Sequence, residues 1–130
     1  ERMRIDSSGN VLVTGVAGLG YGTGSGGTVT QATSKSTTVT LNKPTGAITM
    51  NGAALAANTS VSFLFNNSLI AATDTIVLTP QASSIDMISY QWGVSTNGAG
   101  VAVVYLRNIT GASRSEAVVF NFAIIKGVTS

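Results

Sequence analysis

The chain has 130 residues, of which 44% are hydrophobic and only 9% are charged, and it contains neither histidine nor cysteine. This length fits one compact domain with a single core. The lack of histidine and cysteine excludes disulfides, the common zinc sites and Cys/His nucleophiles. The net charge is +2, and the seven Lys and Arg residues are spread along the chain, so no basic stripe points to nucleic acid. No apolar run reaches the roughly 18 residues of a membrane span.

Residues 1–27 predict a short hairpin followed by a glycine-rich connector. Apolar residues alternate within Met3–Ile5 and Val11–Val13, and a turn at Ser8–Asn10 separates the two segments. From Gly15 to Gly27 every second or third residue is glycine, which suits a flexible connector or a place where backbones approach closely. Because a strand pattern is already present at the first residues, we expect the chain to be a fragment that continues a longer polypeptide.

Residues 28–130 predict a sandwich of short β-strands. The alternation at Thr37–Leu41 indicates a half-buried strand. A turn at Asn42–Gly46 should return the chain, so that Ala47–Met50 forms the partner strand. Two further alternating strands are expected at 60–66 and 75–79.

The clearest hairpin signal is Asn97-Gly98, because both turn positions tolerate positive φ. Strands are therefore expected at Ile85–Ser95 and Val101–Ile109. The last strand, Glu116–Lys126, is largely apolar on both faces. It is either a central strand between two packed layers or a strand whose second face lies against another subunit. About seven to nine such strands without a helix indicate an all-β fold, an antiparallel sandwich of the jelly-roll kind.

Two sequence patterns that suggest chemistry also have simpler structural explanations. The spacing G-x-G-x-x-G at Gly22–Gly27 matches a dinucleotide loop, but the β-branched residues 28–30 cannot supply the helix that binds pyrophosphate. Asp74 could form a glycosidase pair with Asp86 or Glu116, yet turn capping and surface ion pairing explain these carboxylates as well. We expect no catalytic residue, metal site or cofactor.

The best candidates for a ligand site are aromatic. Tyr90 and Trp92 share one face of a predicted strand, and Tyr105 and Arg107 could complete the patch from the partner strand if they lie on the same sheet face. Flat rings beside guanidinium donors suit the face and the hydroxyls of a sugar. The alternative is that Trp92, the only tryptophan, is a core residue. Tyr21, in the glycine-rich segment, is a separate candidate.

Three segments resemble bacteriophage tail proteins. Residues 1–11 (ERMRIDSSGNV) are similar to a segment that recurs in phage tail fibres and tailspikes, often just before a C-terminal module. Residues 20–46 (GYGTGSGGTVTQATSKSTTVTLNKPTG) and 106–126 (LRNITGASRSEAVVFNFAIIK) resemble modules of phage tail or structural proteins. The resemblance implies a virion protein, usually a homotrimer, whose terminal β-domain binds the host surface or caps the fibre. It supplies no ligand-binding residues that can be carried onto this sequence.

These features predict a trimeric domain at the tip of a phage tail fibre or tailspike, in contact with other tail proteins of the virion. We expect it to bind host surface polysaccharide or lipopolysaccharide without turnover, weakly at each site and more strongly through several copies. A purely structural trimerisation or decoration domain is the leading alternative. A third is a lyase or hydrolase fragment whose carboxylates meet between subunits. Neither nucleic-acid binding nor membrane insertion is expected.

Overall fold

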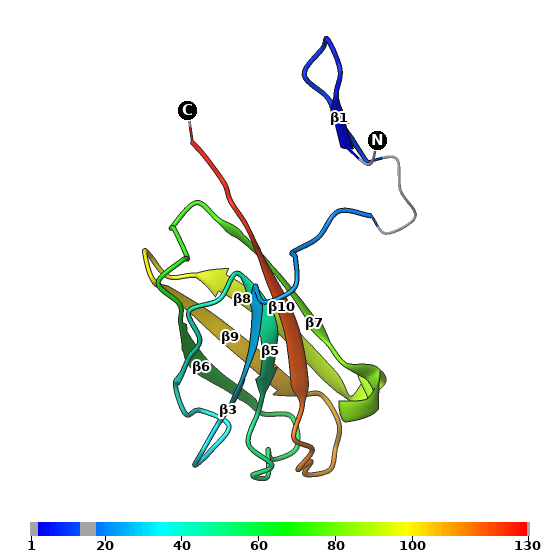
Figure 1. Cartoon of the computed structure of the whole chain (residues 1–130). Helices are drawn as coiled ribbons and strands as arrows, with labels where there is room; N and C mark the ends of the chain where they lie inside the picture. The colour runs from blue at the N-terminus through cyan, green and yellow to red at the C-terminus, as the bar shows by residue number, and fades with distance from the viewer. Residues whose placement is uncertain (1–2, 14–17, 130) are drawn as a thin grey trace.

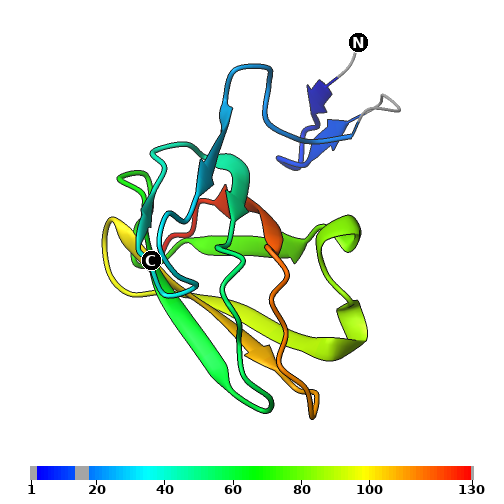
Figure 2. The same cartoon turned by 90° about the horizontal axis from the view of Figure 1, so that it is seen from below.

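The computed structural model describes residues 3–13 and 18–129 and contains two four-stranded sheets packed face to face (Figure 1). The first, the β10 sheet, has the order β3 (Gly26–Thr30), β5 (Thr45–Thr49), β10 (Val119–Ile125) and β7 (Thr75–Pro80). The second, the β9 sheet, has the order β4 (Val39–Thr40), β6 (Ser60–Asn66), β9 (Val101–Asn108) and β8 (Tyr90–Thr96). Seen from below, the sheets form separate layers (Figure 2). The prediction of an all-β fold is confirmed.

Both sheets are mixed, which corrects the prediction of a purely antiparallel sandwich. β3 pairs with β5 in parallel, and β4 pairs with β6 in parallel, whereas the other pairs are antiparallel. The parallel pairs arise because the chain passes from one sheet to the other after each of β3, β4 and β5. The predicted pairing of 37–41 with 47–50 is therefore wrong, since Val39 and Ile48 are buried from opposite sheets.

The two sheets bury their inner faces against each other. Alternate residues of the central strands share this burial, and they are Phe63 and Phe65 of β6, Ala102, Val104 and Leu106 of β9, and Phe120, Phe122 and Ile124 of β10. The rings of Phe65 and Phe122 meet edge to face across the sandwich, with centroids 4.8 Å apart. One of the two apolar faces expected for the last strand is thus buried between the sheets. On its outer face Ile125 is 57% exposed in the single chain.

The hairpin predicted at Asn97-Gly98 forms, but its loop is longer than a two-residue turn. β8 and β9 pair antiparallel up to Thr96 and Ala102. Gly98 and Gly100 take positive φ, while the Asn97 amide donates to the Val101 carbonyl at 3.0 Å. The strand predicted from residue 85 starts only at residue 90, because two short 3₁₀ turns, η1 (Ala82–Ser84) and η2 (Met87–Ser89), connect β7 to β8.

The N-terminal hairpin is confirmed, with strands β1 (Met3–Ile5) and β2 (Val11–Val13). The Asp6 carboxylate organises its turn by accepting hydrogen bonds from the amides of Ser8 and Asn10 and from the Asn10 side chain, each at 2.9 Å. Figure 1 shows this hairpin beyond one end of the sandwich. Glu1, Arg2 and residues 14–17 of the predicted hairpin and connector lie outside the described residues.

The glycine-rich segment contains the close backbone approach that its composition suggests. Gly27 of β3 pairs with Gly46 of β5, and a methyl group on Gly46 would lie 2.2 Å from the Gly27 carbonyl oxygen. No side chain fits this position unless the parallel pair separates. The strand β3 begins at Gly26, so no helix follows the G-x-G-x-x-G spacing and the dinucleotide loop is excluded.

Substitution of Gly46 tests this pairing. We expect Gly46→Ala to lower the free energy of unfolding by about 2 to 3 kcal/mol, because the new methyl group collides with backbone rather than with a movable side chain. Chemical denaturation provides the measurement. Gly52→Ala is the matched control, since its new methyl group would lie at an ordinary 3.5 Å from the Ser115 carbonyl oxygen. Equal stability of the two variants would contradict the close approach.

Candidate functional site

The outer face of the β9 sheet presents one aromatic side chain, that of Tyr105. Because Val104 and Leu106 are completely buried, alternation along β9 directs Tyr105 outward, where it is 44% exposed. Its cross-strand partner on β8 is Gly93. A methyl group on Gly93 would lie 2.4 Å from Cε1 of Tyr105, so the ring lies across the backbone of this glycine. The glycine therefore lets the tyrosine ring lie low against the sheet.

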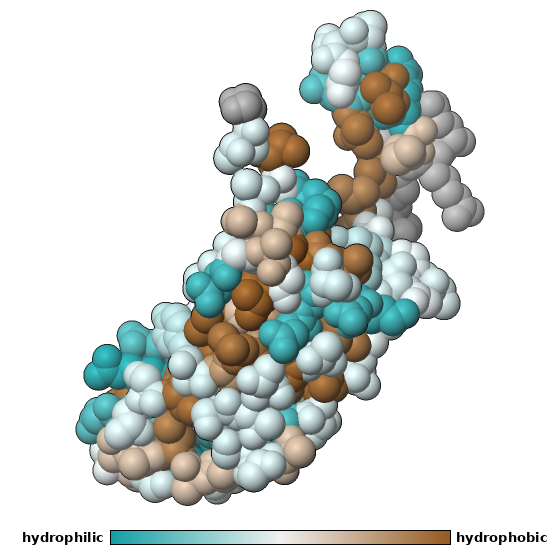
Figure 3. Space-filling model, turned by 90° about the vertical axis from the view of Figure 1, so that its left-hand side faces the viewer, coloured by the Kyte–Doolittle hydropathy of each residue, from teal (hydrophilic) through white to brown (hydrophobic). Residues whose placement is uncertain are grey.

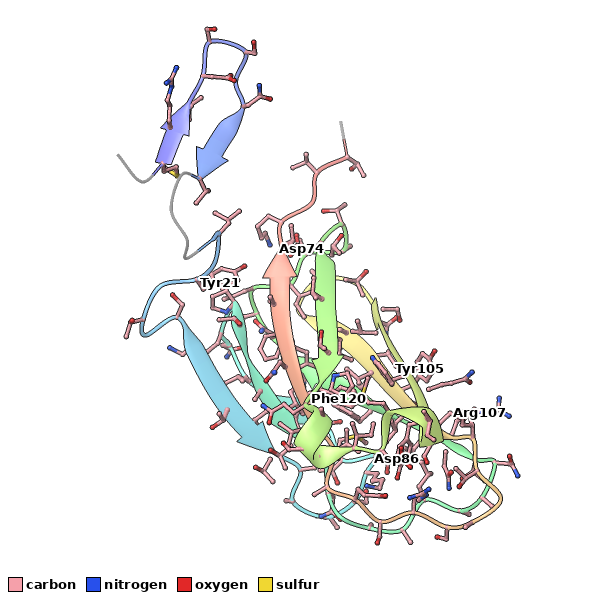
Figure 4. All side chains as sticks on the ribbon, turned by 90° about the vertical axis from the view of Figure 1, so that its right-hand side faces the viewer. Tyr21, Asp74, Asp86, Tyr105, Arg107 and Phe120 are labelled. Atoms are coloured by element: carbon pink, nitrogen blue, oxygen red, sulfur yellow. The ribbon has the colours of Figure 1, made fainter. Side chains whose placement is uncertain are left out.

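Polar side chains flank this ring on one side of the face, whereas the row on its other side contains Leu64 and Val103. Ser62 of β6 pairs with Tyr105 from the other side, and the next row along the sheet holds Ser60, Arg107 and Gln91. All of these side chains are exposed. Figure 4 shows Tyr105 and Arg107 on the side of the sheet away from Phe120, which lies between the layers. We call this surface the Tyr105 face, comprising Ser60, Ser62, Gln91, Gly93, Tyr105 and Arg107.

The sheet separates the four residues predicted as one patch. Tyr90 pairs with Asn108 and Trp92 pairs with Leu106, and both partners are completely buried. Tyr90 and Trp92 therefore point toward the core, opposite to Tyr105 and Arg107. Tyr90 is 3% exposed, while Trp92 is partly buried and packs against the core. The condition that all four side chains share one sheet face is not met.

A hollow at the free edge of β8 brings three of the four residues near one another. It has a volume of about 450 Å³, and the residues that line it are Met87, Tyr90, Gln91, Trp92 and Tyr105. Because Tyr105 and Gln91 belong to the outer face while Tyr90 and Trp92 belong to the inner face, the hollow curves around the edge strand. A molecule that contacts the ring of Tyr105 can therefore also reach the exposed part of the Trp92 indole.

The phenol of Tyr90 belongs to a polar cluster at one end of the sandwich. Its hydroxyl donates to Oε2 of Glu116 at 2.5 Å, and Arg114 bridges Glu116 at 3.2 Å and Asp86 at 3.5 Å. The hydrogen bond from Tyr90 is the main cause that lowers the pKa of Glu116, and Arg114 adds to it. Burial raises the pKa of Tyr90. Asp86 and Glu116 thus both form ion pairs with Arg114.

Asp74 lies at the opposite end of the sandwich from Asp86 (Figure 4). It accepts hydrogen bonds from the amides of Ala71 at 2.8 Å and Gly127 at 3.1 Å, and it pairs with Lys126 at 2.5 Å. The Ala71 amide is the first cause that lowers the pKa of Asp74, followed by Lys126. Within one chain, Asp74 is therefore not brought together with Asp86 or Glu116 as a glycosidase pair.

One buried cation was not anticipated from the sequence. Lys35 is 3% exposed, and its ammonium group donates to the carbonyls of Asn51 at 2.7 Å and Glu116 at 2.6 Å. Burial lowers the pKa of this lysine, and the nearby Glu116 opposes the shift. Its carbonyl partners tie three loops together, so its role is structural.

Gly93 and Gln91 were also not predicted as parts of a site. Alternation alone places Gln91 opposite to Trp92 on β8, and a glycine facing an aromatic residue is the pattern that marks a ring lying on a strand. Recognising this pattern requires the β8–β9 register, which pairs Gly93 with Tyr105.

Comparisons with protein-family models, with curated proteins and with solved structures find no match. Across the described residues, no helix is long and apolar enough to cross a membrane. In the same part of the chain, no three His, Cys, Asp or Glu side chains gather where they could hold a metal ion.

The position of Trp92 makes it a packing residue. We expect Trp92→Ala to lower the free energy of unfolding by about 2 to 3 kcal/mol, because the indole packs against the core while part of it stays exposed. Chemical denaturation of this variant, with Trp92→Phe as the control that keeps a ring, measures the effect. An unchanged denaturation midpoint in Trp92→Ala would show that the indole contributes nothing to the core.

Proposed function

We propose that the chain is the tip domain of a bacteriophage tail fibre or tailspike and binds host surface glycan on the Tyr105 face. The observation that carries this proposal is the tyrosine ring that lies across Gly93 on the exposed outer face of the β9 sheet. The resemblance of residues 1–11, 20–46 and 106–126 to phage tail proteins supports the setting in a virion. Contacts with other tail proteins follow from the same setting.

The chemistry of the Tyr105 face suits a sugar. A pyranose ring has an apolar face of C–H groups that can stack on an aromatic ring, and it has hydroxyls around its edge. Ser62, Gln91 and Arg107 supply hydrogen-bonding groups around Tyr105, since an amide donates and accepts and a guanidinium donates. The site is open and shallow, so each contact is weak. Several copies on one virion would raise the overall affinity.

Binding without turnover agrees with the state of the carboxylates. Asp86 and Glu116 share Arg114, and Asp74 pairs with Lys126. Each carboxylate therefore has a cation as its partner. Glycoside hydrolysis requires two carboxyl groups placed across the scissile bond, one of them protonated as the acid.

A second candidate, a structural trimerisation or decoration domain, rests on the outer face of the β10 sheet. This face carries uncharged side chains, and its most exposed large apolar members, Val77 and Ile125, are 46% and 57% exposed. The outward residues are Gly26, Thr28 and Thr30 of β3, Thr45, Ala47 and Thr49 of β5, Val119, Asn121, Ala123 and Ile125 of β10, and Thr75, Val77 and Thr79 of β7. Leu19 and Tyr21 of the glycine-rich segment line a hollow with Ala123 and Ile125 at one end of this face, and the rest of the face suits packing against further copies of the chain.

The N-terminal hairpin supports the same assembly. Its register places Met3 opposite Val13 and Ile5 opposite Val11, so these four apolar side chains share one face. They are 38% to 65% exposed, and Figure 3 shows apolar side chains at the hairpin. A two-stranded hairpin is marginal on its own. Three copies around an axis would cover these faces.

We further propose that the sandwich is a trimeric jelly roll. The last strand, β10, lies between β5 and β7, and the strand before it, β9, lies between β6 and β8. The repeated passage of the chain between the two layers supports this proposal, while the parallel pairs β3–β5 and β4–β6 depart from the antiparallel pairing of a jelly roll.

Removal of the tyrosine ring tests glycan binding. We expect Tyr105→Ala to weaken binding to host cells or their purified polysaccharide by at least about tenfold, since stacking of a sugar ring is lost. The melting temperature should change little, because the ring lies on an exposed face. Tyr105→Phe keeps the ring and should keep most of the affinity, measured by biolayer interferometry. Equal binding by wild type and Tyr105→Ala would contradict a site on this face.

A charge on the β10 sheet tests the assembly. We expect the wild type to sediment as a trimer and Val77→Glu, at a 46% exposed position of the same face, to shift it toward monomer, because burial of an unpaired carboxylate opposes association. Ser95→Glu is the control, since it places the same charge on the outer side of the other sheet. Sedimentation velocity at several concentrations gives the mass. A wild-type chain that stays monomeric throughout would remove the basis for both the trimer and the structural alternative.

A further inference from the structure

The Tyr105 face carries one charge, and that charge has no acidic partner within the described chain. Arg107 is the only charged residue among the outward side chains of β4, β6, β8 and β9. Arg107 is exposed, and it takes part in none of the ion pairs found among the described residues. We propose that Arg107 selects an acidic glycan, by binding a carboxylate or phosphate group of the sugar that stacks on Tyr105. This inference rests on the proposed function.

Each acidic residue of the described chain has partners other than Arg107. Asp86 accepts from Ser89 at 2.7 Å and pairs with Arg114, and Glu116 pairs with Arg114 and Tyr90. Asp74 pairs with Lys126 at the far end of the sandwich, and Asp6 lies in the hairpin turn. An anion that neutralises Arg107 must therefore come from outside these residues.

The spacing of Arg107 and Tyr105 fits one sugar residue with an acidic substituent. They are two positions apart on β9 and point to the same side, which places their Cα atoms about 7 Å apart. A sugar ring over Tyr105 can therefore direct a ring substituent toward the guanidinium. A guanidinium forms two parallel hydrogen bonds to a carboxylate or phosphate, and this geometry adds specificity.

The neighbours of Arg107 favour this role over a general attraction to anions. Ser60 and Gln91 flank it in the same row, and both are uncharged. Since a single cation cannot follow a chain of phosphates, binding of nucleic acid is not favoured. One exposed ion pair contributes little alone, so recognition depends on the combination of the charge with the stacked ring.

The test compares three glycans of defined charge. Polysialic acid carries carboxylates, a phosphate-containing teichoic acid carries phosphates, and dextran is neutral. We expect the wild type to bind at least one of the two acidic polymers about tenfold more tightly than dextran, with an affinity that falls as salt increases. The acidic polymer that binds more tightly shows whether Arg107 prefers a carboxylate or a phosphate.

Variants of Arg107 assign this preference to one side chain. Arg107→Gln should remove the preference for the acidic polymer, and Arg107→Lys should restore it only in part, because an ammonium group lacks the planar pair of donors. Arg4→Gln, which removes one positive charge in the N-terminal hairpin, is the matched control and should bind as the wild type does. Circular dichroism confirms that each variant folds.

The outcomes separate this inference from the proposed function. Equal binding of dextran and the acidic polymers by the wild type, with loss of all binding in Tyr105→Ala, would overturn the role of Arg107 and leave the glycan site standing. An equal loss of affinity in Arg107→Gln and Arg4→Gln would also overturn it, because net charge would then explain the effect. Failure of the wild type to bind any glycan, including host polysaccharide, would overturn both.

Discussion

Burial of the two inner sheet faces against each other determines where every other side chain of the sandwich can point. Side chains alternate along a strand, so the burial of Val104 and Leu106 in β9 leaves Tyr105 and Arg107 no direction but outward. The same constraint turns Trp92 inward, because it is paired with Leu106. A shift of one residue between β8 and β9 would exchange these roles. The contact between Phe65 and Phe122 helps to fix the two layers relative to each other.

The local pattern of the sequence was sufficient for several elements. The alternation of apolar residues located β6 over 60–66, and it located β7 to within one residue. The Asn97-Gly98 signal located the hairpin between β8 and β9, although the positive φ angles of the loop are at Gly98 and Gly100. These elements depend on neighbours close in the sequence, and the period of two is visible there.

Features that depend on distant parts of the chain could not be predicted. The parallel pairs β3–β5 and β4–β6 join strands that are separated by another strand in the opposite sheet. No local signal distinguishes this arrangement from a simple hairpin. For the site, the sequence pointed to Tyr105 and Arg107, but their separation from Tyr90 and Trp92 is decided by register. Gly93 acquires its meaning only as the partner of Tyr105.

The chain enters the sandwich at β3 and leaves it after β10 at the same end of the two sheets. Gly26, where β3 begins, is aligned with Thr45, and Thr45 is aligned with Ala123, close to the end of β10. The hairpin and the last described residues accordingly leave from the same end in Figure 1. Any polypeptide joined to either end of the described chain would therefore lie at this same end of the sandwich. The opposite pole carries the loop between β9 and β10, whose shape is fixed by the hydrogen bond from the buried Asn108 side chain to the Ala112 carbonyl at 2.7 Å.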